Sequence, residues 1–324
     1  MLLVRAAALL ILAFFSVMPG CAQVENCQHR TLAVSTGSSD GSSAPLLGSA
    51  NFEGIFRRKP VHVISAVMNR EPVRVILLLD VSGSMQDFYS GYEGTSSLNL
   101  AEELVSMIPP ESAIGLGFFH TEFIPVLRPT TDREKVRNQL EGLRSHPGSF
   151  RGKTALWDAV LGGVKMFDRP RLGDVIYVIT DGDDNASKVT MNHVSQPLEE
   201  AGVRLFAFVF QKPKRPGQIE SVKGFLQQVV RDTGGAIVVQ MSEADGSVNL
   251  SASLTLFDKS GKLTRFGSDL ESQSKQLGNF YRINIELPET LSKPQEWKLE
   301  LAGLEEPQRK KIALTYPHVL VACN

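Results

Sequence analysis

The residues with the clearest chemical potential form a short loop of oxygen-bearing side chains after an apolar run. The run Val75–Leu79 leads directly into Asp80, and Ser82 and Ser84 follow at alternate positions with Gly83 between them. Glycine lets such a loop turn tightly enough for the three side chains to converge on one point. A carboxylate and two hydroxyls are hard oxygen donors, which suit Mg²⁺ or Mn²⁺ better than zinc. The loop therefore predicts a magnesium-type site, and the alternative is an ordinary turn built from the same residue types.

Two later residues fit the same site. Thr154 stands at the start of a helical pattern, and Asp181 follows directly after the apolar run Val175–Thr180. Open α/β sheets bind their ligands at the carboxyl ends of the strands, and both residues are expected at that edge. We therefore predict that they join the first loop. Asp183 and Asp184 are interpreted either as solvated loop charges or as groups that support the ligands.

Apolar runs alternate with helical periods through the middle of the chain. The runs are short and nearly continuous, as strands covered on both faces should be. Strands that alternate with helices imply βαβ crossovers and a mostly parallel, doubly wound sheet, so we predict a Rossmann-like α/β fold. The strands are expected at 73–79, 113–119, 175–180, 203–210 and 236–239, and the helices at 98–108, 132–143, 155–167, 193–201 and 222–233.

Both flanks of this region have β-rich patterns. Residues 23–70 contain strand-like runs around a loop rich in serine and glycine. Residues 243–324 contain short segments of alternating apolar residues, which are typical of half-buried antiparallel strands. We predict a β-rich lead-in (23–70), an α/β domain (71–242) and a β-rich C-terminal region (243–324), with the two flanks forming one accessory unit.

The three motifs resemble the metal-ion-dependent adhesion site of von Willebrand factor A domains. The resemblance rests on Asp-x-Ser-x-Ser at Asp80, on Lys-Thr-Ala-Leu-Trp-Asp at Thr154 and on Ile-Thr-Asp-Gly-Asp-Asp-Asn at Asp181. They occur in the family's order within residues 72–240. The resemblance implies a bound Mg²⁺, or Mn²⁺ or Ca²⁺ in its place. The implied ligands of the ion are Asp80, Ser82, Ser84, Thr154 and Asp181.

The same resemblance implies adhesion to a partner rather than catalysis. In the family, one position on the ion stays open, and an Asp or Glu carboxylate of a protein partner commonly fills it. An ion held largely by neutral hydroxyls keeps positive charge, which favours an acidic ligand. Lys153 departs from the small residue that the family often has before the threonine. Its charge would either repel the ion or help to attract an acidic partner.

Two enzyme classes and one structural role are the alternatives. A phosphatase-like fold also places an aspartate after an apolar strand, but it needs a second aspartate where this chain has Ser82. A serine hydrolase needs Gly-x-Ser-x-Gly between strand and helix, and the loop does not match that pattern. A structural envelope protein whose A domain has lost its metal is disfavoured because all five ligand types are present.

The overall charge excludes some classes of partner. Lys and Arg number 34 against 35 Asp and Glu, which gives a formal net charge of -1. Such a chain has no global field to attract nucleic acid or an anionic membrane. With 42% hydrophobic residues in 324, the chain can bury a sizeable core. We therefore expect a globular protein that binds neither DNA nor RNA.

The first 22 residues have the pattern of a secretory signal peptide. Arg5 precedes an apolar run from Ala6 to Met18, and small residues follow it. The run is shorter than the roughly 20 residues that a membrane-spanning helix needs, and no later segment is long enough either. We expect cleavage after Ala22 and export to the periplasm or the medium. The alternative is a lipoprotein acylated at Cys21.

Cleavage after Ala22 would leave two cysteines, Cys27 and Cys323, at opposite ends of the mature chain. An even pair in an oxidising compartment is a candidate disulfide. The alternative is two unpaired buried thiols. A bridge between them would tie the β-rich lead-in to the β-rich C-terminal region.

Overall fold

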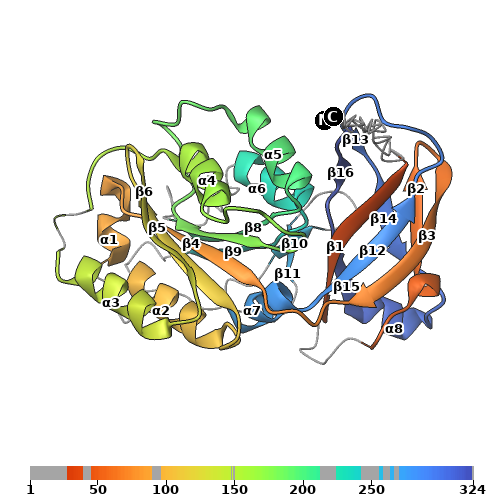
Figure 1. Cartoon of the computed structure of the whole chain (residues 1–324), viewed down its shortest axis with the longest axis horizontal. Helices are drawn as coiled ribbons and strands as arrows, with labels where there is room; N and C mark the ends of the chain where they lie inside the picture. Colours follow the sequence, from red (N-terminus) through yellow and green to blue (C-terminus); the bar gives the residue numbers. More distant parts are fainter. Residues whose placement is uncertain are drawn as a thin grey trace, which may run out of the picture.

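The structure is a computed structural model that shows two lobes side by side, each built on its own sheet (Figure 1). The predicted leader and all three cysteines lie outside the described residues, so the disulfide between Cys27 and Cys323 stays a prediction. Among the described residues, no helix is both long enough and apolar enough to span a bilayer. The described residues are 28–38, 45–89, 96–146, 148, 150–211, 224–241, 255–257, 263–265 and 270–322.

An eight-stranded sheet runs through the larger lobe (Figure 1). Its strands are β4 (Arg74–Asp80), β5 (Ala113–Phe119), β6 (Phe123–Thr130), β7 (Val175–Thr180), β8 (Arg204–Gln211), β9 (Ile237–Met241), β10 (Thr255–Phe257) and β11 (Leu263–Arg265). They are ordered β11-β10-β9-β8-β7-β4-β5-β6. The strands from β9 to β5 run parallel, and β6 and the β10–β11 pair extend the two edges in antiparallel fashion. The predicted mostly parallel α/β sheet is confirmed.

Helices cover both faces of this sheet (Figure 1). They are α1 (Gln86–Tyr89), α2 (Ser97–Met107), α3 (Arg133–Arg144), α4 (Leu156–Lys165), α5 (Ser195–Glu200), α6 (Gly224–Asp232) and α7 (Leu270–Gly278). Successive residues of β4 enter different cores: Leu77 packs with α2, α3 and α7, whereas Ile76 and Leu78 pack with α4, α5 and α6. A strand buried on both faces must be apolar at every position, which explains the unbroken run before the site.

The smaller lobe is a six-stranded antiparallel sheet assembled from both flanks of the chain. Its order is β14-β2-β3-β12-β1-β15, so β1 from the lead-in lies between two strands from the C-terminal region. The predicted accessory unit is confirmed as an additional β-rich sheet. Its strands are β1 (His29–Ser38), β2 (Phe52–Phe56), β3 (Lys59–Met68), β12 (Phe280–Glu286), β14 (Lys298–Leu301) and β15 (Ile312–Thr315).

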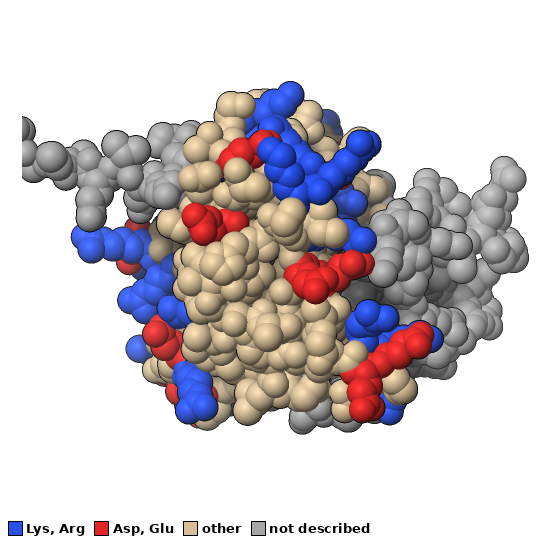
Figure 2. All heavy atoms as spheres, turned by 90° about the vertical axis from the view of Figure 1, so that its right-hand side faces the viewer, with Lys and Arg blue, Asp and Glu red and all other residues tan. Residues whose placement is uncertain are grey.

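Short elements complete the smaller lobe. They are the helical turn η1 (Ser49–Asn51), the strand pair β13 (Gln295–Glu296) and β16 (Val319–Leu320), and helix α8 (Glu306–Lys311). The side of the molecule that this lobe presents is uncharged over most of its middle, with Lys, Arg, Asp and Glu gathered toward its margins (Figure 2). The strands β10 and β11 also come from the chain beyond residue 242, yet they belong to the eight-stranded sheet.

A buried arginine joins the two lobes. Arg204 begins β8, and its guanidinium donates to Ser35 Oγ at 2.9 Å, and to the carbonyl oxygens of Gln276 at 3.0 Å and Leu277 at 2.6 Å. Ser35 belongs to β1, and the two carbonyls belong to α7. Burial lowers the pKa of Arg204 to about 9. One side chain therefore fixes the accessory sheet and α7 to the amino end of the larger sheet.

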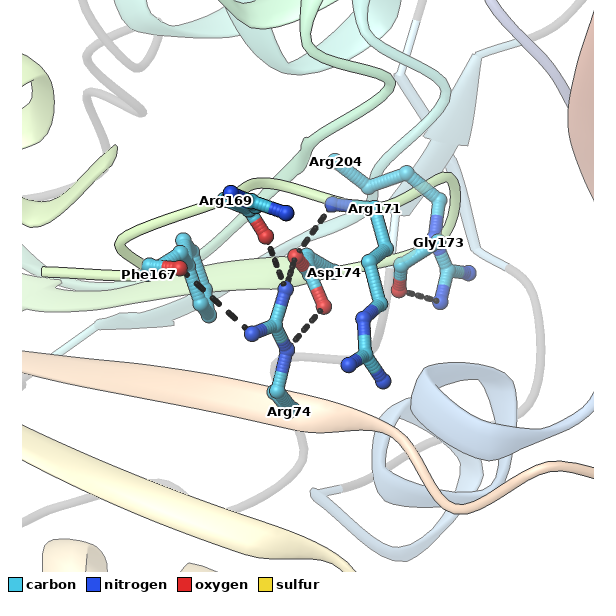
Figure 3. Close-up of polar contacts among 7 residues, drawn as sticks. All are labelled: Arg74, Phe167, Arg169, Arg171, Gly173, Asp174 and Arg204. Carbon is cyan, nitrogen blue, oxygen red and sulfur yellow. Dashed lines mark hydrogen bonds and ion pairs between the residues drawn. The ribbon is translucent and has the colours of Figure 1, made fainter. Parts of the chain in front are cut away.

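A second arginine lies at the same end of the sheet (Figure 3). Arg74 begins β4, and its Nε donates to Asp174 Oδ1 at 2.9 Å while its Nη2 donates to the carbonyl of Arg169 at 2.8 Å. Asp174 is buried and also accepts from the backbone N–H of Arg171 at 2.7 Å. The loop before β7 is thereby tied to the first residue of the strand that ends in Asp80.

Candidate metal centre

The site begins with Asp80, the last residue of β4, whose side chain is 1% exposed. Its Oδ1 accepts from the backbone N–H of Ser82 at 2.9 Å, and its Oδ2 accepts from Thr180 Oγ1 at 2.6 Å. Burial raises the pKa of Asp80 to about 7; the hydrogen bonds from Ser82 and Thr180 oppose the rise, and the charge of Asp181 adds to it. The carboxylate is therefore held by its own loop and by the neighbouring strand β7.

The two serines lie next to each other on the loop that follows. Ser82 precedes the helical turn η2 (Gly83–Met85), and its Oγ is 3.1 Å from Ser84 Oγ. Ser82 is buried and Ser84 is exposed, while Met85 is completely buried and anchors the turn in the core. Ser82 thus contacts both Asp80 and Ser84, while the predicted convergence of the three side chains on an ion stays a prediction.

Thr154 reaches this loop through backbone hydrogen bonds of the residues before it. Arg151 N donates to Val81 O at 2.9 Å, and Gly83 N donates to Gly152 O at 3.2 Å. Gly152 has a φ of +81°, a backbone conformation that residues with a Cβ rarely adopt. Two hydrogen bonds and a glycine therefore lay the Thr154 segment against the Asp80 loop, and Thr154 itself is buried.

Asp181 opens the third loop, directly after β7. Its Oδ1 accepts from the backbone N–H of Asp183 at 3.1 Å. Further along this loop, Asn185 Oδ1 accepts from Thr154 N at 2.8 Å, and the N–H groups of Asn185 and Ala186 both donate to Thr154 O at 2.9 Å. The third loop therefore surrounds the backbone of Thr154. Its first residue, Asp181, directly follows Thr180, which is the strand residue that contacts Asp80.

Three supporting residues were not singled out in the sequence. Thr180 bridges to Asp80, and Asn185 holds the backbone of Thr154. Ser187 Oγ accepts from Trp157 N at 2.9 Å. Thr180 and Asn185 lie within the motif around Asp181, and this position in the sequence is the signal that could have identified them as supporting residues. A hydroxyl next to a ligating carboxylate is a common support of a metal ligand.

Asp184 supports the site by holding the start of α4. Its Oδ1 accepts from Leu156 N at 3.0 Å and from the hydroxyl of Ser187. The first N–H groups of a helix have no partner within it, so this carboxylate satisfies one of them. Of the two interpretations offered for Asp184, the contacts favour support of the ligands. Asp183 contributes its backbone N–H to Asp181.

Lys153 lies at the rim of the site. Its backbone N–H donates to Thr121 Oγ1 at 3.2 Å, and its side chain is exposed. Within the described part of the chain, its ammonium group makes no ion pair. No ion pair within the described residues therefore neutralises the positive charge of Lys153, which lies next to Thr154 in the sequence.

The donor set fits a hard divalent cation. Hydrogen bonds connect the three loops that carry two carboxylates and three hydroxyls, at the carboxyl ends of β4 and β7. Among the described residues, no group of three or more His, Cys, Asp or Glu side chains is placed to hold a metal ion. A buried Asp80 with no cationic side chain beside it suits an ion such as Mg²⁺.

Comparison with known proteins finds a family model that matches part of the larger lobe. The sequence model of the von Willebrand factor type A domain family matches residues 75–183, a range that includes all five predicted ligands and ends within the third motif. No curated protein sequence matches the chain.

Three solved structures match parts of the chain. The conserved hypothetical protein BatB from Bacteroides thetaiotaomicron is 18% identical, with 64% of this chain and 86% of that chain covered and a TM-score of 0.37. An aerotolerance-related membrane protein from Bacteroides fragilis NCTC 9343 is 20% identical, with the same coverage and a TM-score of 0.36. The SpRpn10 VWA domain is 12% identical, with 54% and 90% covered and a TM-score of 0.40.

Proposed function

Because residues 75–183 form a von Willebrand factor type A domain, which is a protein-interaction module, we propose that the protein binds a protein partner through a divalent cation. Mg²⁺, or Mn²⁺ or Ca²⁺ in its place, is held at the carboxyl edge of the sheet, and the partner supplies an Asp or Glu carboxylate to its open position. When bound, the ion supplies the positive charge that attracts this carboxylate. The proposed ligands are Asp80, Ser82, Ser84, Thr154 and Asp181.

The observation that carries this proposal is the hydrogen-bonded junction of the three ligand loops. Asp80 is held from two sides, by Ser82 N and by Thr180 Oγ1, so its position is fixed before any ion arrives. The Thr154 backbone is fixed in the same way by Asn185. A site whose ligands are already placed loses little conformational entropy when the ion binds.

The same geometry favours binding over catalysis. Among the residues that the structure describes, the hydroxyls of Ser82 and Ser84 contact each other, and neither contacts a histidine. A serine nucleophile of the Ser–His type needs a histidine within hydrogen-bond reach, and Ser82 instead contacts the carboxylate of Asp80. We therefore propose that the protein is not an enzyme. The alternative is an envelope protein in which the domain is purely structural and binds no ion.

The place of action follows from the leader. We propose that the first 22 residues direct export and that the protein works in the periplasm or outside the cell, or at a membrane surface if Cys21 is acylated. In that compartment Cys27 and Cys323 are proposed to pair.

Metal binding tests the proposal directly. Titration calorimetry of the exported protein with MgCl₂ and MnCl₂ is expected to show one site. Asp80→Asn keeps the shape of the side chain and its contact with Ser82 N but removes the charge. We expect it to weaken the ion at least about 100-fold, or about 2.7 kcal/mol, because a primary anionic ligand is lost.

Glu103→Ala is the matched control, since Glu103 is an exposed carboxylate on α2 far from the ligands in the sequence. It should bind the ion as the parent does. Saturable Mg²⁺ or Mn²⁺ binding that survives Asp80→Asn would place the ion elsewhere. No binding by the parent would leave the structural envelope role as the better description.

A further inference from the structure

A largely apolar groove lies on the side of the α/β domain, between the edge strand β6 and helix α4. It is a hollow of about 820 Å³, and its lining is largely apolar. Phe123 and Leu127 come from β6, Leu161 and Met166 from α4 and the residue after it, and Val189 from the loop that follows β7. Nothing in the proposed metal site uses this groove.

Packing between the two elements builds the floor of the groove. A Cβ added at Gly162 would lie 2.3 Å from the ring of Phe123, so glycine at this position lets the ring lie directly on the helix. Met166 is only 5% exposed and closes the floor beyond the end of α4. The hollow is therefore a fixed feature of a packed strand and helix rather than of a loose surface loop.

The charges around the groove are unevenly paired. Asp158 is engaged by the backbone N–H of Lys188 at 3.0 Å and by that of Val189 at 3.1 Å, and Arg128 forms an ion pair with Asp168. The side chains of Lys165 and Lys188 are exposed, and neither makes an ion pair within the described residues. Two cations without an ion-pair partner therefore border an apolar floor, and they outnumber the single carboxylate of Asp158.

The strand at the border argues against one mode of binding. Of the eight residues of β6, Pro125 and Pro129 lack the N–H that a further strand would need. Prolines in an edge strand oppose the addition of a strand from another chain. A helix in the groove needs no such hydrogen bonds, because its backbone is already paired and its apolar side chains fill the hollow.

We propose that this groove docks an acidic amphipathic helix of a partner protein. The lining from Asp158 to Met166 extends along about 12 Å of α4, at 1.5 Å per residue, which matches somewhat more than two turns of a docked helix. Apolar side chains at positions i, i+3, i+4 and i+7 enter the groove, and Glu or Asp side chains beside them face Lys165 and Lys188. The interaction does not pass through the metal site.

The test uses a stapled helical peptide with leucine at i, i+3, i+4 and i+7 and glutamate at the flanking positions, labelled with fluorescein. Anisotropy with the full exported protein is expected to show saturable binding, with a dissociation constant on the order of 10 µM. The double variant Lys165→Glu/Lys188→Glu should weaken it at least about tenfold. Its matched control is Lys293→Glu/Lys310→Glu, the same charge change at exposed lysines of the smaller lobe, which should bind within about twofold of the parent.

Each outcome bears on the proposal. Weaker binding in the groove variant alone, with no effect of chelator, supports it. It is overturned if the peptide does not bind the parent, if the groove variant binds as well as the parent, or if a peptide with lysine in place of glutamate binds equally well. Sedimentation is run in parallel. A dimer of the parent that the groove variant loses would make a second copy the occupant and overturn the partner helix.

Discussion

At the amino end of the eight-stranded sheet, Arg74 is matched to Asp174, and Arg204 donates to a hydroxyl and several carbonyls. At the carboxyl end, Asp80 and Asp181 have no cationic side chain as a partner among the described residues. The sheet thus has arginines held by several hydrogen bonds at its amino end, although Nε of Arg204 has no partner in the described structure, and carboxylates without a cationic partner at its carboxyl end. Arginines held by several acceptors suit a permanent contact between the lobes, and carboxylates without a cation suit a ligand that binds and leaves.

The largest effect is expected from removing the Arg204 contacts that join the two lobes. Arg204→Met would leave Ser35 Oγ and the carbonyls of Gly173, Gln276 and Leu277 without the donor they share. We expect the free energy of unfolding to fall by about 3 kcal/mol or more, because several buried acceptors are orphaned at once. Urea denaturation followed by tryptophan fluorescence measures this. These contacts would be unimportant if the variant unfolded within about 0.5 kcal/mol of the parent.

A smaller effect is expected at the carboxyl end of the sheet, where the ion is proposed to bind. Thr154→Ala removes one hydroxyl from the site while leaving the backbone contacts to Asn185 in place. We expect Mg²⁺ affinity to fall about tenfold, equivalent to about 1.4 kcal/mol, and Thr154→Ser to bind nearly as the parent does because it keeps the oxygen. Calorimetry on both variants measures this. Equal losses in the two would exclude a coordinating role for the hydroxyl.

The smallest effect is expected from Glu199, a buried carboxylate near the amino end of the sheet that has no cationic partner among the described residues. Glu199 lines a cavity of about 690 Å³ between the lobes, and neither of its carboxylate oxygens has a hydrogen-bond partner in the described structure. Burial raises its pKa to about 9, helped by the charges of Asp232 and Glu200. Between its ordinary value and 9, the folded state binds more protons than the unfolded state, so stability should fall as pH rises.

Glu199→Gln removes this penalty. At pH 8 we expect the variant to be more stable than the parent by at least about 1 kcal/mol, the equivalent of less than one unit of pKa shift, and at pH 5 the two should differ little. Chemical denaturation at both pH values checks the prediction. A difference that does not change with pH would show that Glu199 is charged in the folded protein.

The sequence predicted the central strands well because burial on both faces requires apolar residues at every position, as in β4. The sequence also indicated that the Asp80 and Asp181 loops lie at one edge of the sheet, because parallel strands end at the same edge. Strand β6 was not predicted: Pro125 and Pro129 interrupt its pattern, and only an edge position tolerates them.

Long-range pairing explains most of what the sequence could not show. The position of β1 between β12 and β15 depends on partners from the other end of the chain. Arg204 looked like an ordinary charged residue at the start of a strand, because its acceptors come from segments before and after it in the chain. At the site, the bond from Thr180 to Asp80 joins two strands that periodicity treats separately.

The interleaved accessory sheet also has a consequence for the order in which the protein can fold during synthesis. Leu32 pairs with Ile283, and Ser35 pairs with Thr315, so β1 must wait for almost the whole chain before it meets either neighbour. The strands β4, β5 and β7 pair over much shorter separations and can assemble while the ribosome is still adding the rest. A nascent chain that has not reached β12 therefore presents β1 with both edges unpaired, which makes that strand the part of the molecule most in need of protection while the protein is being made.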